Sequence, residues 1–284
     1  MPTLTNLPST PTETPAAGPL PPPETRRRDI AALILPLLVL LAALGLWAGI
    51  TSLRVHGQLL VPTYGTPSPL AVVQGVPDEL HSGRLFSDTV ASLFRVGLGF
   101  GLAVVLGIPL GLWMGGQPLA RAAFLPGVNF FRCLSPLAWF PFAILWFGVG
   151  DAPAIFLIFM ASLFPMTLAT IAAVSSIPSV TFRVARDYGY RGRNLILHVT
   201  LPAVAPQIIT AMRVTAGLAW VVVVAAEMVS GKDGLGFATW DARNGLRMDL
   251  LVVNMCVIGV IGVLLDRLLL QLTKITSVRW GYEQ

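Results

Sequence analysis

Six long apolar stretches that contain very few charged residues limit most strongly how this chain can fold. A helix needs about 20 residues to cross the ~30 Å hydrocarbon core of a bilayer. The six stretches are Ile30–Leu53, Thr89–Met114, Cys133–Gly150, Ala152–Val180, Leu201–Val229 and Leu250–Thr273. Cys133–Gly150 is short and contains prolines, so we expect a preceding helix from about Leu119 to lead into it. The pattern predicts an all-α integral membrane protein with about six transmembrane helices.

The charge content excludes a soluble globular protein. Charged residues make up 12% of the chain and apolar residues 55%, whereas soluble domains carry roughly 25% charged residues. The net charge of +5 is scattered between apolar segments, so it does not indicate nucleic-acid binding. With the amino terminus inside, ten Lys and Arg residues fall in cytoplasmic segments and five fall outside. This excess predicts that both termini are cytoplasmic.

The stretches divide the chain into a tail, a first helix and a core. Residues 1–28 are rich in Pro and Thr and show no apolar period. Such a segment cannot bury enough surface to offset its ordering entropy, so we predict a disordered cytoplasmic tail. We expect the first transmembrane helix at 29–54 and the transmembrane core at 85–275.

Glycines four residues apart recur in the second stretch. Gly97 and Gly101, Gly107 and Gly111, and Gly111 and Gly115 each form such a pair. Small residues at this spacing let helix backbones approach closely in a membrane. We therefore expect this helix to lie in the middle of the bundle, and tight packing is favoured over a sliding role in transport.

The sequence lacks the common motifs of catalytic and metal sites. It contains no phosphate loop and no His-Glu-x-x-His motif, and His56, His81 and His198 lie far apart. No Ser or Cys nucleophile has a base near it in the sequence. We therefore predict no catalytic residue, no metal site and no cofactor bound by this chain, so that active transport would need a partner or an ion gradient.

A basic segment between the fourth and fifth stretches is the most specific feature. Residues 183–202 read RVARDYGYRGRNLILHVTLP. Gly189 lets the chain turn sharply between two short helices. Leu195, Ile196 and Val199 place apolar groups at helical spacing, which would seat a helix in a groove on a soluble partner.

This cytoplasmic segment resembles the EAA loop of ATP-binding-cassette (ABC) importer permeases, whose pattern is E-A-A, three residues, G, nine residues and I-x-L-P. Here Ala185 and Gly189 fall on the second alanine and on the glycine. Pro202 is expected in the first turn of the next span, where its missing N–H is harmless. The family's Glu is Arg183 here, so an ion pair made by that Glu is not carried over. The residues that the resemblance assigns to ATPase coupling are Arg183, Ala185, Asp187, Gly189, Leu195, Val199, Leu201 and Pro202.

Further motifs extend the resemblance over most of residues 60–280. They are Ser92-Leu-Phe-Arg95-Val, Gly107-Ile-Pro-Leu-Gly111, Ile144-Leu-Trp-Phe-Gly-Val-Gly150, Ala226-Glu227-Met228, Gly234-Leu-Gly236 and Arg279-Trp280. Together they are similar to the nitrate/sulfonate/taurine/bicarbonate branch of these permeases, although Asp88 stands where many members carry His. The resemblance implies a type I ABC importer (MetI-like) permease fold in the cytoplasmic membrane of a bacterium.

The resemblance also implies partners and a mechanism. A second permease copy would form a homodimer with this chain, and two ABC ATPase subunits would bind ATP and Mg. An extracytoplasmic solute-binding protein would deliver a small anion of the sulfonate, taurine, nitrate or bicarbonate class. The anion would then cross by alternating access.

Charged residues within the predicted helices are candidates for a translocation path or gate, because charges inside a membrane are costly. These residues are Arg95, Arg132, Arg213 and Glu227. The alternative is pairing within the bundle, for example of Arg213 with Asp266. We favour pairing, because in the importers that this chain resembles a separate binding protein does most of the selecting.

A secondary transporter or channel without an ATPase is the alternative function. Such proteins often show repeated halves and acidic residues near the membrane midplane. We find no internal repeat, and Glu227 lies near a helix end. Co-purification of an ATPase would favour the importer. A membrane-embedded enzyme, a third class, would need a catalytic constellation that the sequence does not show.

Overall fold

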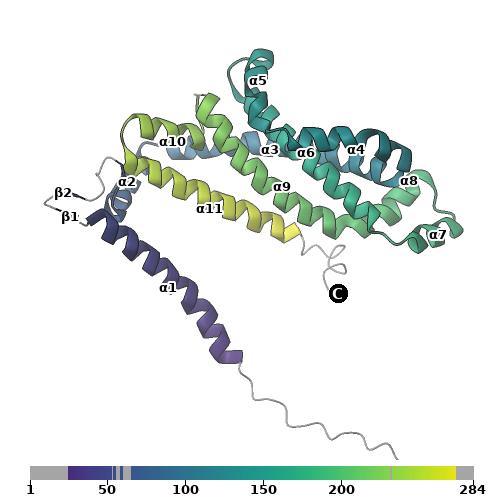
Figure 1. Cartoon of the computed structure of the whole chain (residues 1–284), viewed down its shortest axis with the longest axis horizontal. Helices are drawn as coiled ribbons and strands as arrows, with labels where there is room; N and C mark the ends of the chain where they lie inside the picture. The colour runs from purple at the N-terminus through teal and green to yellow at the C-terminus, as the bar shows by residue number, and fades with distance from the viewer. Residues whose placement is uncertain (1–24, 53, 56–57, 60–64, 231, 273–284) are drawn as a thin grey trace, which may run out of the picture. The chain divides into compact units, whose positions relative to one another are not determined.

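The structure is a computed structural model of the chain, which describes residues 25–52, 54–55, 58–59, 65–230 and 232–272 (Figure 1). The chain divides into two compact units, Met1–Ile50 and Thr51–Gln284. Helix α1 (Thr25–Ser52) supplies the described part of the first unit, and its last two residues belong to the second. The prediction of a first transmembrane helix at 29–54 overlaps α1. The predicted tail lies mostly outside the described residues, and α1 already begins at Thr25.

The second unit is built from helices. A two-residue antiparallel ladder, β1 (Arg54–Val55) with β2 (Gln58–Leu59), is the only strand pairing in the part of the chain that is described. The helices that follow are α2 (Pro69–His81), α3 (Arg84–Gly116), α4 (Pro118–Cys133), η1 (Pro136–Trp139), α5 (Phe140–Phe147), α6 (Asp151–Ser175), α7 (Ser179–Asp187), α8 (Gly192–Leu195), η2 (Ile196–Thr200), α9 (Leu201–Ser230), α10 (Leu235–Asn244) and α11 (Met248–Leu272).

Five described helices are long and apolar enough to cross a membrane, and a bent pair brings the number to six. The bent pair is α4 with the η1–α5 segment, and its two halves meet at 88°. Pro136 begins η1 directly after this break, and a proline both lacks an N–H donor and disfavours helix in the residue before it. The prediction of about six membrane helices is confirmed: five are continuous helices, and the third predicted stretch falls in the bent pair.

Helices α3 and α6 pack along each other at the centre of the bundle. Gly99, Gly107, Gly111 and Gly115 face this seam, and Ala103, fully buried, continues the four-residue spacing between the first two. A Cβ at Gly111 would overlap the Cβ of Thr170 on α6 and lie 2.8 Å from the Thr167 carbonyl oxygen. The small residues therefore set the distance between the two helices.

One of the predicted glycine pairs lies on a different face of α3. A Cβ at Gly97 or Gly101 would meet nothing within 4 Å, so the expectation that this pair packs closely is wrong within the single chain. Gly107, Gly111 and Gly115 were expected to pack and do so. The spacing of four occurs on more than one face of a helix, and the sequence does not show which face meets a neighbour.

The main apolar core lies where α6 and α9 meet. It is formed by small and branched side chains such as Leu157, Ile158 and Val223, which are fully buried. Trp220 ties α9 to α11 by donating its indole N–H to the carbonyl oxygen of Ile258 at 3.1 Å. These contacts join the first half of α6 to the second half of α9, next to Asp151 and Glu227, which belong to the ion network described below.

Candidate functional site

A tight turn connects α7 to α8 at one end of the bundle (Figure 1). Gly189 has a φ of +86°, in the left-handed region that favours glycine. The Gly189 amide donates to the carbonyl oxygen of Arg186 at 3.0 Å, and the Tyr190 amide donates to that of Ala185 at 3.0 Å. This pair of bonds is the Schellman arrangement that ends a helix. The sharp turn predicted at Gly189 is therefore present, and its hydrogen bonds define it.

The helix after this turn starts earlier than we predicted. Helix α8, the π-helical segment η2 and α9 follow one another without a break from Gly192 to Ser230. Leu201 and Pro202 therefore lie in the first turn of α9 but not at the start of the span. The Leu201 amide donates to the Ile196 carbonyl oxygen, five residues back. This wider turn directly precedes Pro202, and π-turns of this kind are common where a helix is distorted.

Helix α7 has an exposed apolar face that the sequence reasoning missed. Val180, Val184 and Tyr188 repeat every four residues and are 61%, 47% and 81% exposed. Together with the half-buried Val199, they border an open groove of about 430 Å³. The sequence contains a four-residue repeat of large side chains that predicts this face, but the arginines between them make the segment read as a basic loop. The buried Ala185 lies beside these residues and also lines the groove.

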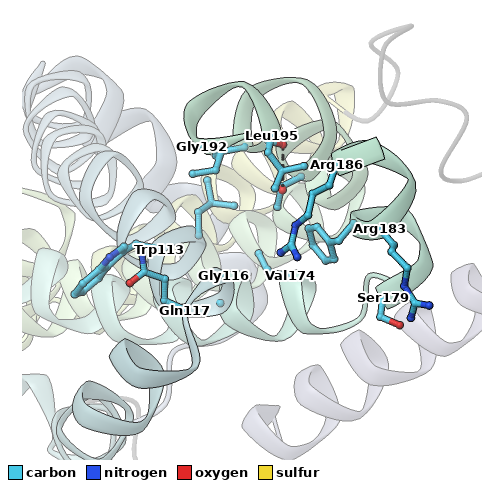
Figure 2. A pocket seen from close by; sticks show the side chains of 14 residues that line it. Trp113, Gly116, Gln117, Val174, Ser179, Arg183, Arg186, Gly192 and Leu195 are labelled. Atoms are coloured by element: carbon cyan, nitrogen blue, oxygen red, sulfur yellow. Dashed lines mark hydrogen bonds between the residues drawn. The ribbon is translucent and has the colours of Figure 1, made fainter. Parts of the chain in front are cut away.

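The other predicted apolar groups point elsewhere. Leu195 and Ile196 line a cavity of about 480 Å³ behind α7, bounded also by the ends of α3 and α6 (Figure 2). Arg183 and Arg186 contribute its charged side chains. Asp187, at the end of α7, is exposed and does not line the cavity. The apolar groups expected to form one contact surface are thus divided between the groove on one side of α7 and the partly open cavity on the other.

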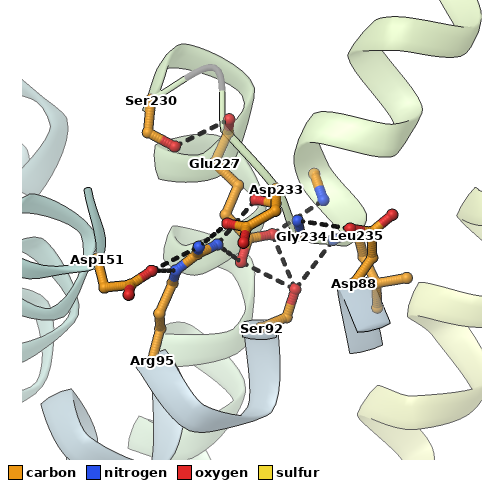
Figure 3. Close-up of polar contacts among 10 residues, drawn as sticks. Asp88, Ser92, Arg95, Asp151, Glu227, Ser230, Asp233, Gly234 and Leu235 are labelled. Carbon is orange, nitrogen blue, oxygen red and sulfur yellow. Dashed lines mark hydrogen bonds and ion pairs between the residues drawn. The ribbon is translucent and has the colours of Figure 1, made fainter. Parts of the chain in front are cut away.

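In the first half of α3 a partly buried ion network surrounds Arg95 (Figure 3). The Arg95 side chain is only 1% exposed and meets carboxylates from three other segments. It donates to Asp151, the first residue of α6, at 2.6 and 2.8 Å. It also donates to Glu227 on α9 at 2.8 Å, and to Asp233, which precedes α10. A buried guanidinium is costly unless carboxylates neutralise it. Because the carboxylates come from three other segments, the network holds four segments together.

A second layer of hydrogen bonds secures the start of α10. Glu227 is fully buried and accepts from the Ser92 hydroxyl at 2.8 and 2.9 Å and from the Gly236 amide at 2.9 Å. The Leu235 amide donates to the Ser92 hydroxyl at 3.0 Å, and the Gly234 amide to Asp88 at 3.0 Å. Side chains of α3 thus satisfy the free amides at the start of α10. Asp88 therefore has a capping role.

The remaining predicted charged residues lie apart from this network. Arg213 forms two hydrogen bonds to Asp266 on α11 at 3.0 and 3.1 Å, so the predicted pairing of these two residues is confirmed. Arg132 is exposed in the last turn of α4. The sequence offered Arg95 and Glu227 as separate candidates, and the structure brings them together. The partners Asp151 and Asp233 were missed, because both lie outside the apolar stretches that were searched for charges.

Comparison with known proteins agrees with this architecture. Residues 107–275 match the family described as "Binding-protein-dependent transport system inner membrane component". The chain is 32% identical to the taurine transport system permease protein TauC of Escherichia coli over 224 residues, 78% of this chain and 81% of TauC. It is 34% identical to the bicarbonate transport system permease protein CmpB of Synechococcus elongatus over 245 residues, 85% of this chain and 88% of CmpB.

A solved structure supports the fold. A chain from an inward-facing crystal structure of the MetNI methionine ABC transporter superposes with a TM-score of 0.50 at 20% identity, covering 65% of this chain and 96% of that chain. The family match spans more than half of the sequence, and the relatives are above 30% identity over most of it. The predicted type I fold and family are therefore confirmed: this chain belongs to the binding-protein-dependent ABC importer permeases, as a multi-pass inner-membrane transport subunit.

Proposed function

We propose that the chain works as a homodimer with two ATPase subunits and a solute-binding protein, and that it imports a small anion by alternating access. The named relatives carry taurine and bicarbonate, which supports an anion of the sulfonate, taurine, nitrate or bicarbonate class. The sequence has no phosphate loop, so ATP and Mg would bind in the ATPase subunits. The exposed apolar face of α7 is the observation that carries the proposal.

This face has the form of a helix that docks into a groove. Val180, Val184 and Tyr188 lie at i, i+4 and i+8 on a short helix, which is the spacing of apolar anchors in helix-in-groove recognition. In the orientation favoured by the Lys and Arg count, with both termini cytoplasmic, α7 lies on the cytoplasmic side, where an ATPase would meet it. We assign this face, rather than Leu195 and Ile196, to the ATPase contact.

Movement of α7 would reach two membrane helices directly. The chain passes from α6 into α7 through only three residues, and from α7 through the Gly189 turn into the continuous α8–α9 helix. Ser176 and Gln207 also join the ends of α6 and α9 through a 3.1 Å hydrogen bond. An ATPase that displaced α7 would therefore pull on both helices of the main core.

The network around Arg95 and Glu227 fits a role at the outer end of the bundle. In the same orientation it would face the binding protein. We propose that it keeps this end of α3, α6 and α9 joined while the opposite end moves. Arg132 is exposed and has no ion pair among the described residues, so it remains our candidate for a contact with the anion along the path. Arg213, paired with Asp266, would instead stabilise α9 against α11.

The coupling role is tested by Gly189→Ala with Gly83→Ala as the matched control. Both glycines have positive φ, +86° and +68°, and a Cβ at either would meet nothing within 4 Å. Each substitution should cost about 1–2 kcal/mol of backbone strain. Only Gly189 lies in the segment proposed to couple to the ATPase, residues 183–202, which we call the coupling segment. We expect Gly189→Ala to lower ATPase association and binding-protein-stimulated ATP hydrolysis in nanodiscs, and Gly83→Ala to leave both unchanged.

Two outcomes would count against the proposal. If the two variants behave alike, the turn has no coupling role. If no ATPase co-purifies with the wild-type chain, the alternative of a transporter or channel without an ATPase takes its place. When the complex assembles, ATP-driven uptake of taurine, nitrate and bicarbonate into proteoliposomes, with the binding protein present, identifies the anion.

A further inference from the structure

The cavity behind α7 is not explained by ATPase docking. It has a volume of about 480 Å³ and lies on the side of α7 opposite the exposed apolar face. Arg183 and Arg186 are the charged residues that line it, and none of its described lining residues is acidic. Figure 2 shows the Arg186 guanidinium pointing inward toward Val174, and that of Arg183 at the rim next to Ser179.

The two guanidinium groups have unused hydrogen-bonding capacity. Neither forms an ion pair with a carboxylate in the described part of the chain, although the other end of the bundle supplies three carboxylates to Arg95 alone. A guanidinium carries five N–H donors in a planar fork that matches carboxylate, phosphate and sulfonate groups. Two guanidinium groups at one cavity, with no acidic residue in the described wall, create a positive potential that would attract an anion.

The rest of the wall suits a ligand with a charged head and some apolar surface. Gln117 and Ser179 add neutral polar groups, and Trp113 and Phe182 add aromatic surface. A volume of 480 Å³ lies within the range of about 300–1,000 Å³ typical of small-molecule sites. We propose that this cavity binds an anionic oxyanion group of the phosphate or sulfonate type, held by Arg186 and Arg183.

The same chemistry is offered by a free anion and by a lipid headgroup. Trp113 is near the end of the long apolar helix α3, where tryptophans commonly meet the membrane interface, so an anionic phospholipid can reach the cavity as well as a soluble oxyanion. In either case the ligand would connect α7 to α3 and α6 and would hold the coupling segment in place. The binding itself can be measured on the permease alone, so it does not depend on ATPase docking.

The test uses the purified full-length chain in phosphatidylcholine nanodiscs. Sodium sulfate is titrated against sodium chloride at matched ionic strength, and tryptophan fluorescence reports binding. A second set of nanodiscs contains added phosphatidylglycerol. Arg186→Gln removes the inward guanidinium, and Arg193→Gln is the matched control because Arg193 belongs to the same segment, is exposed and does not line the cavity. Trp113→Phe identifies the responding tryptophan.

We expect a saturable response that Trp113→Phe removes. Arg186→Gln should weaken binding about tenfold or more, since a hydrogen bond to a charged group contributes about 1.5–3 kcal/mol, while Arg193→Gln should leave it unchanged. A response to sulfate identifies a soluble ligand, and a response only to phosphatidylglycerol identifies a lipid headgroup; both support the site.

The proposal is overturned if neither anion source gives a saturable response, or if Arg193→Gln weakens binding as much as Arg186→Gln does. The second result would mean that general surface charge, and not the cavity, attracts the anion. If Arg186→Gln fails to fold, Arg186→Lys keeps the charge but loses the fork, and it should retain weaker binding.

Discussion

Replacement of Gly111 by Ala tests the central seam between α3 and α6, and Gly101→Ala is its control. Both glycines lie in α3, so the gain in helix propensity, about 1 kcal/mol, is shared. Only the new methyl group at Gly111 would overlap Thr170 and approach the Thr167 carbonyl oxygen at 2.8 Å; at Gly101 it would meet nothing within 4 Å. Overpacking of this kind costs about 1–3 kcal/mol. We therefore expect Gly111→Ala to be about 1–3 kcal/mol less stable than Gly101→Ala.

Thermal unfolding of the detergent-purified chain measures the difference. At about 2–4 °C per kcal/mol for a chain of this size, Gly101→Ala should melt above the wild type, and Gly111→Ala should melt below Gly101→Ala by about 2–12 °C. Adding Thr170→Gly to Gly111→Ala removes the overlapping Cβ. The double variant should recover about 0.5–3 kcal/mol relative to the sum of the two single changes, which is the usual range for residues in contact.

Two results would refute the reasoning about the seam. Equal melting temperatures for Gly111→Ala and Gly101→Ala would show that α3 and α6 do not approach as closely as the structure has them. A purely additive double variant would show that Thr170 is not the group that the new methyl meets. Either result would remove the argument that small residues set the spacing at the centre of the bundle.

Two further substitutions test the polar contacts by the same unfolding measurement. Glu227→Gln should lower the free energy of unfolding by about 3–5 kcal/mol because it removes a buried partner of Arg95. Asp241→Asn, in an exposed ion pair with Arg84, should cost under about 1 kcal/mol. Similar losses would show that burial does not decide the contribution of these ion pairs. Trp220→Phe should cost about 1 kcal/mol, since it removes the hydrogen bond to the Ile258 carbonyl oxygen; an unchanged stability would mean that this bond does not hold α9 to α11.

The membrane helices could be predicted because lipid imposes one simple condition. A spanning segment must be helical and apolar over about 20 residues. Five of the predicted stretches overlap such a helix, and Cys133–Gly150 overlaps the second half of the bent pair. The bounds were less accurate where polar residues continue a helix. Helix α3 begins at Arg84, five residues before the predicted start at Thr89, and the span containing α9 begins at Gly192 rather than Leu201. Hydropathy locates the part of a helix in lipid and not the part beyond it.

The partners of the buried charges could not be predicted in the same way. Arg95 meets residues that are 56, 132 and 138 positions away in the sequence, and no local pattern encodes such pairs. The Gly189 turn was predictable because its cause is local, namely a glycine that adopts a positive φ. The exposed face of α7 lay between these cases: its repeat is local, but which face of a short helix is covered depends on the helices around it.

The two ends of the bundle differ in the kind of contact that joins their helices, and this difference bears on which end can move. At one end the buried Arg95 meets three carboxylates, of which that of Glu227 is also fully buried, and breaking this buried pair costs several kcal/mol. At the end that carries α7, Arg183 and Arg186 have no ion pair among the described residues. There the ends of α6 and α9 are joined by apolar packing of Ala173 and Val174 against Val204 and Ile208, and by the exposed hydrogen bond of Ser176 with Gln207, a contact that contributes about 0.5–1.5 kcal/mol. An ATPase acting on α7 would therefore work against non-directional apolar packing and a surface hydrogen bond rather than against a buried ion pair, and the packed seam of α3 and α6 would carry the displacement toward the end that the ion pairs hold.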